Sequence, residues 1–114
     1  MPRRDAYEAL FTALAHPARR RIVITLHFTG GSMTAGEIAA MFAHAWPTTT
    51  GHLRVLQAAG LVRQTREGRT RVYTLDRRRL ALVRDWLSQI TEDADDQERR
   101  AATVPHQRRG RKSR

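Results

Sequence analysis

The hydrophobic period of this chain changes at Gly60, and that change limits the folds it can adopt. Before Gly60 the apolar residues recur at the spacing of amphipathic helices. After it, residues 61–66 and 71–75 are β-prone and flank a short turn that contains Gly68, which is the pattern of a β-hairpin. The helical period returns at about 77–91. The sequence therefore predicts a mainly α protein with a small β-hairpin, in the order α-α-α-α-β-β-α.

Local signals place the ends of the helices that precede the hairpin. His16-Pro17 separates the first two, because proline suits the first position of a new helix. Thr34 and Glu37 have the spacing of a capping box. Gly60 can take the left-handed conformation that ends a helix. We expect helices over about 5–15, about 17–28, about 35–42, and from Trp46 to Gly60.

The balance of charge favours a polyanionic partner. The formal net charge is +10, carried by 20 Arg and one Lys against 11 acids, and arginine suits forked contacts with phosphate and guanine. No apolar run approaches the ~20 residues of a membrane span, and no signal peptide opens the chain. We therefore expect no membrane partner and a cytoplasmic protein.

The fourth helix and the hairpin together predict a winged helix-turn-helix. Two short helices joined by a tight link place the second in the major groove, which admits one α-helix. No Asp or Glu occurs from Trp46 to Gly60, whereas an ordinary surface helix, the alternative, usually mixes acids with bases. Thr49, Leu53 and Leu56 are expected to face the core. We assign DNA contacts on the recognition helix to Trp46, Thr48, Thr50, Gly51, His52 and Arg54.

The hairpin is predicted to act as the wing. It carries four arginines against the single acid Glu67, and narrow minor grooves attract arginine. The alternative is a hairpin whose edge charges only prevent aggregation. We assign Arg66, Arg69 and Arg71 to DNA contacts of the wing, and Thr34 to the DNA backbone.

The first and last helices are more apolar than one small core requires, which predicts a homodimer. Such an interface would be self-complementary and would place two recognition helices about 34–36 Å apart. The alternative is that these side chains serve only the core of the protomer. The expected interface residues are Tyr7, Phe11, Leu14, Leu80, Val83, Trp86 and Leu87.

Residues 1–91 are expected to form the DNA-binding and dimerisation domain, and residues 92–114 a disordered tail. The tail is first acidic and then basic, with five acids in 92–98 and seven bases in 99–114. It is either a solvated end or an arm that binds phosphate without sequence preference.

Enzyme chemistry finds little support in the sequence. The five histidines show no HExxH spacing, and neither a Gly-rich phosphate loop with a lysine nor a nucleophile elbow is present. There are no cysteines, so no thiolate metal site can form. We predict no catalytic residues, no cofactor and no metal site.

Four segments in order resemble the ArsR/SmtB family of repressors over about residues 5–91. They are LAHPARRRI (14–22), TAGEIA (34–39), WPTTTGHLRVLQAAGLV (46–62), and EGR with VYTL (67–69 and 72–75). The resemblance implies a winged-helix dimer, joined through its first and last helices, that sits on a promoter palindrome and leaves when an inducer changes its shape.

Departures from the family pattern concern the inducer and the base contacts. Metal-sensing members carry a Cys-x-Cys motif near the third helix or Asp and His ligands on the last one. Here residues 38–42 contain no Cys and residues 76–91 no His, so the chain resembles the metal-independent branch, with an unidentified small-molecule inducer left open. Gly51 replaces an arginine, and Ala45 a serine cap, that many members have.

The sequence thus supports a sequence-specific DNA-binding transcriptional regulator, most simply a repressor. Two alternatives stay open at this point. One is a non-specific, architectural nucleic-acid binder driven by total charge. The other is a winged helix used for contact with another protein.

Overall fold

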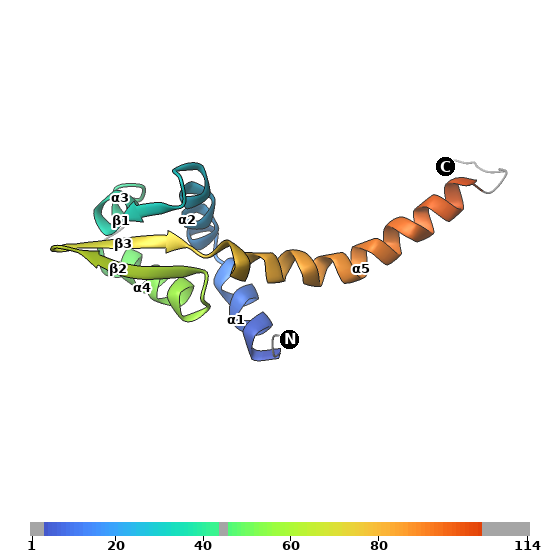
Figure 1. Cartoon of the computed structure of the whole chain (residues 1–114), viewed down its shortest axis with the longest axis horizontal. Coiled ribbons are helices and arrows are strands. Elements are labelled where there is room, and N and C mark those ends of the chain that lie inside the picture. The colour runs from blue at the N-terminus through green and yellow to red at the C-terminus, as the bar shows by residue number, and fades with distance from the viewer. Residues whose placement is uncertain (1–3, 44–45, 104–114) are drawn as a thin grey trace. The chain divides into compact units, whose positions relative to one another are not determined.

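The computed structural model describes residues 4–43 and 46–103. The described residues up to Val83 form one compact unit, and those from Arg84 onward form a second. The elements follow one another as α1 (Arg4–Leu14), α2 (Pro17–Phe28), β1 (Ser32–Thr34), α3 (Ala35–Ala39), α4 (Trp46–Ala58), β2 (Val62–Glu67), β3 (Thr70–Leu75) and α5 (Arg77–Thr103) (Figure 1). The prediction of a mainly α winged helix-turn-helix is confirmed.

The hairpin belongs to a sheet with one more strand than the sequence predicts. β1 pairs antiparallel with β3, so that the strand order is β1-β3-β2. β1 has only three residues, too few for a period of two to stand out from the flanking sequence. α3 ends at Ala39 rather than near 42, and the capping box at its start is formed as predicted.

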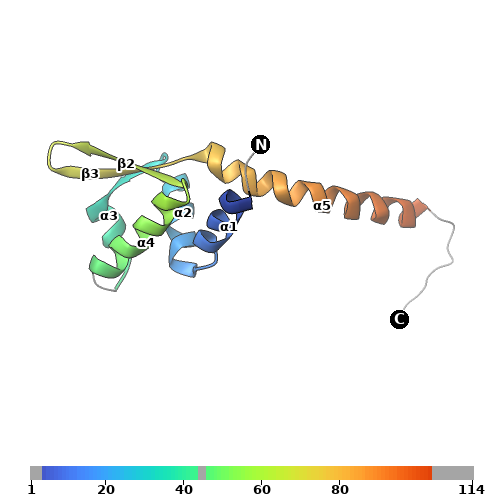
Figure 2. The same cartoon turned by 90° about the horizontal axis from the view of Figure 1, so that it is seen from below.

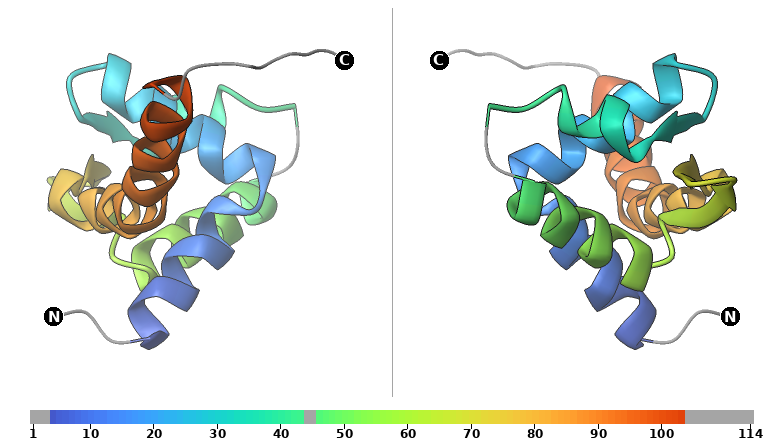
Figure 3. Two further views of the ribbon diagram at one scale, coloured as in Figure 1. Left: turned by 90° about the vertical axis from the view of Figure 1, so that its right-hand side faces the viewer. Right: turned by 90° about the vertical axis from the view of Figure 1, so that its left-hand side faces the viewer.

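One apolar core holds the first unit together. α1, α2 and α4 pack against one another, and the sheet closes the core (Figure 3). Leu10, Leu26, Ile38, Leu56 and Leu61 are among its fully buried side chains. In β3, Tyr73 and Leu75 are buried two residues apart, so the change of hydrophobic period at Gly60 follows the change from helix to strand.

α5 continues to Thr103, twelve residues beyond the predicted end at 91. The prediction of disorder is therefore wrong for residues 92–103, while 104–114 lie outside the described residues. Ala, Glu, Gln and Arg are good helix formers, and they are frequent in this stretch. Arg100 lies in the last turn, where a cation complements the helix dipole. Among the described helices, none is both long and apolar enough to cross a bilayer.

Candidate nucleic-acid interface

α4 has one face in the core and one in solvent. Thr49, Leu53 and Leu56 are buried, as the sequence predicts. On the other side, Trp46 is 51% exposed. Thr48, Gly51 and Arg54 are also exposed, and Thr50 is half-buried. The outward face of α4 therefore offers hydroxyls, an open backbone at Gly51 and a guanidinium, with no carboxylate to repel phosphate.

His52 does not belong to that face, and its predicted outward placement is wrong. The residue is only 9% exposed. Its Nδ1 lies 3.3 Å from Nη1 of Arg19, and its ring centroid lies 4.4 Å from that of His16. The helical period contained the signal: position 52 is three residues after buried Thr49 and four before buried Leu56, so all three share one side.

The wing presents a pair of arginines on the side of the sheet that faces the core. Arg66 is the cross-strand partner of Arg71, four pairs beyond Val62 and Leu75, which are buried. Side chains alternate along a strand, so Arg66 and Arg71 share the face that packs on the helices. Both are exposed, and like charges directly opposite each other destabilise a sheet. A phosphate placed between them would relieve that repulsion.

The wing also reaches beyond the helices. In Figures 1 and 2 the turn between β2 and β3 extends past the ends of α3 and α4. Gly68 takes a positive φ of 65° in this turn, which glycine adopts without strain. Arg69 follows it and is exposed. The three predicted wing arginines therefore lie on the projecting part of the hairpin.

Hydrogen bonds at both ends of the motif fix its backbone. Nε of Arg79 donates to the carbonyl of Ala59 at 3.0 Å and so caps the C-terminal end of α4. At the start of α3, Oγ1 of Thr34 accepts from the N–H of Glu37 at 3.1 Å. The Thr34 hydroxyl still has a hydrogen to donate. Its predicted contact with the DNA backbone therefore remains compatible with the capping box.

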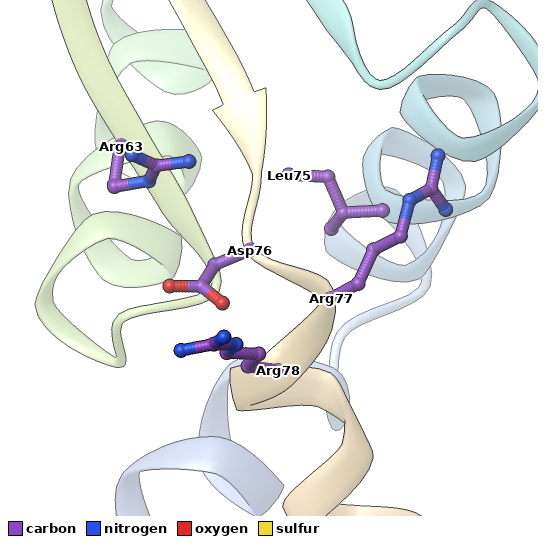
Figure 4. A pocket seen from close by; sticks show the side chains of 5 residues that line it. All are labelled: Arg63, Leu75, Asp76, Arg77 and Arg78. Carbon is purple, nitrogen blue, oxygen red and sulfur yellow. The ribbon is translucent and has the colours of Figure 1, made fainter.

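A second basic region lies at the opposite end of the hairpin, in a shallow pocket lined by Arg63, Leu75, Asp76, Arg77 and Arg78. Figure 4 shows the Asp76 carboxylate between the Arg63 and Arg78 side chains, with Arg77 directed away. Nη1 of Arg77 lies 2.7 Å from Nδ1 of His27, and Asp76 accepts from the N–H of Arg79. The pocket thus contains its own anion, and it is a weaker candidate than α4 and the wing.

Comparisons with known proteins agree with this geometry. A helix-turn-helix domain model matches residues 14–65. The transcriptional repressor SdpR of Bacillus subtilis (strain 168) is 32% identical over 87 residues, which are 76% of this chain and 94% of SdpR. This chain belongs to the ArsR/SmtB family. The family consists of DNA-binding transcriptional regulators and not of enzymes.

Two further ArsR/SmtB comparisons cover most of the chain. The HTH-type transcriptional repressor SmtB of Mycobacterium tuberculosis is 35% identical over 91 residues, which are 79% of this chain and 66% of SmtB. The crystal structure of an ArsR family transcriptional regulator has a TM-score of 0.74 and 28% identity, and the match covers 82% of this chain and 95% of that one.

The predicted interface residues of this ArsR/SmtB protein fall into two groups. Leu14, Leu80 and Val83 are partly buried against the core of the protomer, and Tyr7 is half-buried. Phe11 and Trp86 are each 36% exposed, and Leu87 is 45% exposed. Ile90, which the prediction omitted, is 53% exposed; its spacing from Leu87 and Trp86 along the helix was the available signal. The described residues include no cluster of three or more side chains suited to a metal ion.

Proposed function

We propose that this ArsR/SmtB protein represses transcription by laying the outward face of α4 in the major groove of duplex DNA. The observation that carries the proposal is the exposure of Arg54 on a helix without acids, next to a wing that pairs Arg66 with Arg71. Arg54 is the side chain best suited to a base edge, since arginine donates two parallel hydrogen bonds to guanine. The wing arginines then contact the neighbouring backbone or minor groove.

Two substitutions test this assignment. The DNA fragment that the purified protein selects from its genome serves as the probe. Arg54→Ala is expected to weaken binding by ~1–3 kcal/mol and to relax specificity at one base pair, as expected for the loss of a guanine contact. Arg69→Ala is expected to weaken binding to all sequences alike and to reduce the salt slope by about one, as expected for the loss of a phosphate contact.

Arg84→Ala is the matched control. Arg84 is an exposed arginine outside α4 and the wing, and Nη2 of Arg84 lies 3.1 Å from Oδ1 of Asp85. Its removal lowers the net charge by the same amount as the two test substitutions. If Arg84→Ala weakens binding as much as Arg54→Ala, total charge rather than the winged helix drives association. If deletion of residues 99–114 abolishes all DNA binding, total charge is likewise the driving force of association.

We further propose a homodimer on a palindromic operator, in the cytoplasm. Leu87 and Ile90 on α5 expose much of their apolar surface to water, and a small domain gains stability when such surface is covered. Phe11 on α1, in the first unit, is also an exposed apolar side chain. With no cysteine in the chain, we place this repressor in the metal-independent branch of its family, with any inducer an unidentified small molecule.

A further inference from the structure

His52 is a polar residue of α4 that faces the protein rather than solvent. Its neighbours are the end of α1 and the start of α2, where His16 and Arg19 lie. The residues on either side of it, Gly51 and Leu53, differ sharply: Gly51 is exposed and Leu53 is buried. His52 therefore lies at the boundary between the core-facing side of α4 and the side proposed to enter the groove.

Arg19 connects this position to two other elements. Its Nε donates to the carbonyl of Ala13 at 2.8 Å, and its Nη2 donates to the carbonyl of Thr12 at 3.2 Å. Both carbonyls lie in the last turn of α1. The carbonyl of Thr12 also accepts the N–H of Ala15 at 3.2 Å. The remaining Nη1 lies 3.3 Å from Nδ1 of His52. One guanidinium from α2 thus joins the end of α1 to the middle of α4.

The chemistry of this contact fixes which atom must accept. A guanidinium has only donors, so Nδ1 of His52 accepts the bond and carries no proton. His16, whose ring packs on His52, uses its own Nδ1 to accept the N–H of Ala18 and so caps α2. Both histidines are therefore held at the α1–α2 junction.

No side chain packs at Gly51, the neighbouring outward position, so packing there does not hold α4 in place. Gly51 has no side chain, and a Cβ built on it meets nothing within 4 Å. A rotation of α4 about its axis would displace Thr50 and Arg54 from any base edge, and hydrogen bonds weaken steeply when their geometry is lost. The polar contact of His52 opposes that rotation.

We propose that His52 is a positioning residue: its bond to Arg19 adds to the burial of Leu53 and Leu56 in fixing the rotation of α4, and DNA affinity depends on an acceptor at the Nδ1 position. The inference rests on the proposed function of α4, and it assigns to His52 no contact with DNA.

His52→Asn and His52→Gln form a matched pair of test variants. Both remove the imidazole ring and its packing on His16, and both introduce a neutral amide. The Asn oxygen can occupy the place of Nδ1 and accept from Arg19, whereas the Gln amide extends one bond further, toward the place of Nε2. Each variant is measured for its thermal midpoint, for its affinity for the selected genomic fragment and for the salt slope of that affinity.

The proposal predicts that His52→Asn retains affinity within about threefold, whereas His52→Gln loses about tenfold, the equivalent of one hydrogen bond to a charged group. The salt slope stays unchanged in both variants, because no phosphate contact is removed. Equal losses in the two variants would overturn the proposal. A salt slope reduced by about one in both would mean instead that His52 touches phosphate.

Arg19→Met removes the donor of the same bond. It tests the proposal independently in case His52→Gln folds poorly. It is expected to weaken binding about tenfold in the wild-type background. It should weaken binding much less in the two variants that already lack the bond, His52→Gln and His52→Leu. An equal additional loss in every background would overturn the proposal. The affinity of Arg54→Ala is measured alongside. If Arg54→Ala leaves DNA affinity unchanged, the proposed function fails. If Arg54→Ala weakens binding but His52→Asn and His52→Gln bind equally well, only this inference fails.

Discussion

Replacement of Thr49 by valine should make this protein more stable, although it changes a polar residue of the proposed recognition helix. Thr49 has no exposed surface, and its Oγ1 has no hydrogen-bond partner among the described residues. A buried hydroxyl without a partner costs about 1–3 kcal/mol of stability. Valine has nearly the same shape and the same branching at Cβ, so it fits the space without a new constraint on the helix.

The expected gain in the free energy of unfolding is about 1–2 kcal/mol. For a domain of this size each kcal/mol raises the midpoint of thermal unfolding by roughly 4–8 °C. Urea unfolding gives the free energy directly, provided that both proteins are measured at one concentration, because dimerisation would make the apparent stability depend on it. DNA affinity should stay within about twofold, since a change of 0.4 kcal/mol or less corresponds to that factor.

Thr50→Val is the matched control on the neighbouring position. Thr50 is half-buried and lies toward the outward face, so its replacement should change stability by no more than about 0.5 kcal/mol and should weaken DNA binding. A Thr49→Val variant that is no more stable than wild type would refute the burial argument. If both variants weaken DNA binding equally, the division of α4 into two faces is wrong.

Four further substitutions test three other parts of the structure. Thr34→Ala removes the side-chain half of the capping box and should lower the free energy of unfolding by about 1 kcal/mol in urea titrations. Gly60→Ala should cost about 1–2 kcal/mol, because φ is +78° there and the new Cβ would lie 2.8 Å from Nε of Arg79. Leu87→Arg and Ile90→Arg should each shift the proposed dimer toward monomer in sedimentation experiments, because a charge would enter the apolar interface.

Each of these changes has its own control. Thr34→Ser keeps the acceptor oxygen and should retain most of the lost stability; equal losses for Ala and Ser would show that the cap contributes nothing. Gly30 also has a positive φ but no atom within 4 Å of a built Cβ, so Gly30→Ala should cost less than Gly60→Ala. Ile24 is 55% exposed on α2, and a monomer produced by Ile24→Arg but not by Leu87→Arg would move the interface to α2.

The sequence was sufficient for the elements whose patterns are long or chemically explicit. Pro17, the capping box at Thr34 and Gly60 each carry a local signal for a helix end, and the structure has helix ends at those points. The sequence was insufficient where pairing with a segment distant in the chain determines the structure. β1 exists because β3 pairs with it, and three residues alone cannot show that.

His52 and α5 illustrate two different limits. The charge pattern of α4 drew His52 into the predicted DNA-binding set, whereas its helical spacing placed it with Thr49 and Leu56. Its actual partner, Arg19, lies 33 positions away and no local pattern relates the two. In α5 the charges of residues 92–98 suggested disorder, but helix propensity prevailed as far as Thr103.

The most direct test of the proposed DNA interface is the change in backbone amide chemical shifts when the selected DNA fragment is added to the labelled protein. The account predicts the largest changes at Thr48–Arg54 and at Arg66–Arg71, with little change at Phe28, which is 77% exposed on α2. Changes concentrated on α2, with α4 and the wing unaffected, would contradict it.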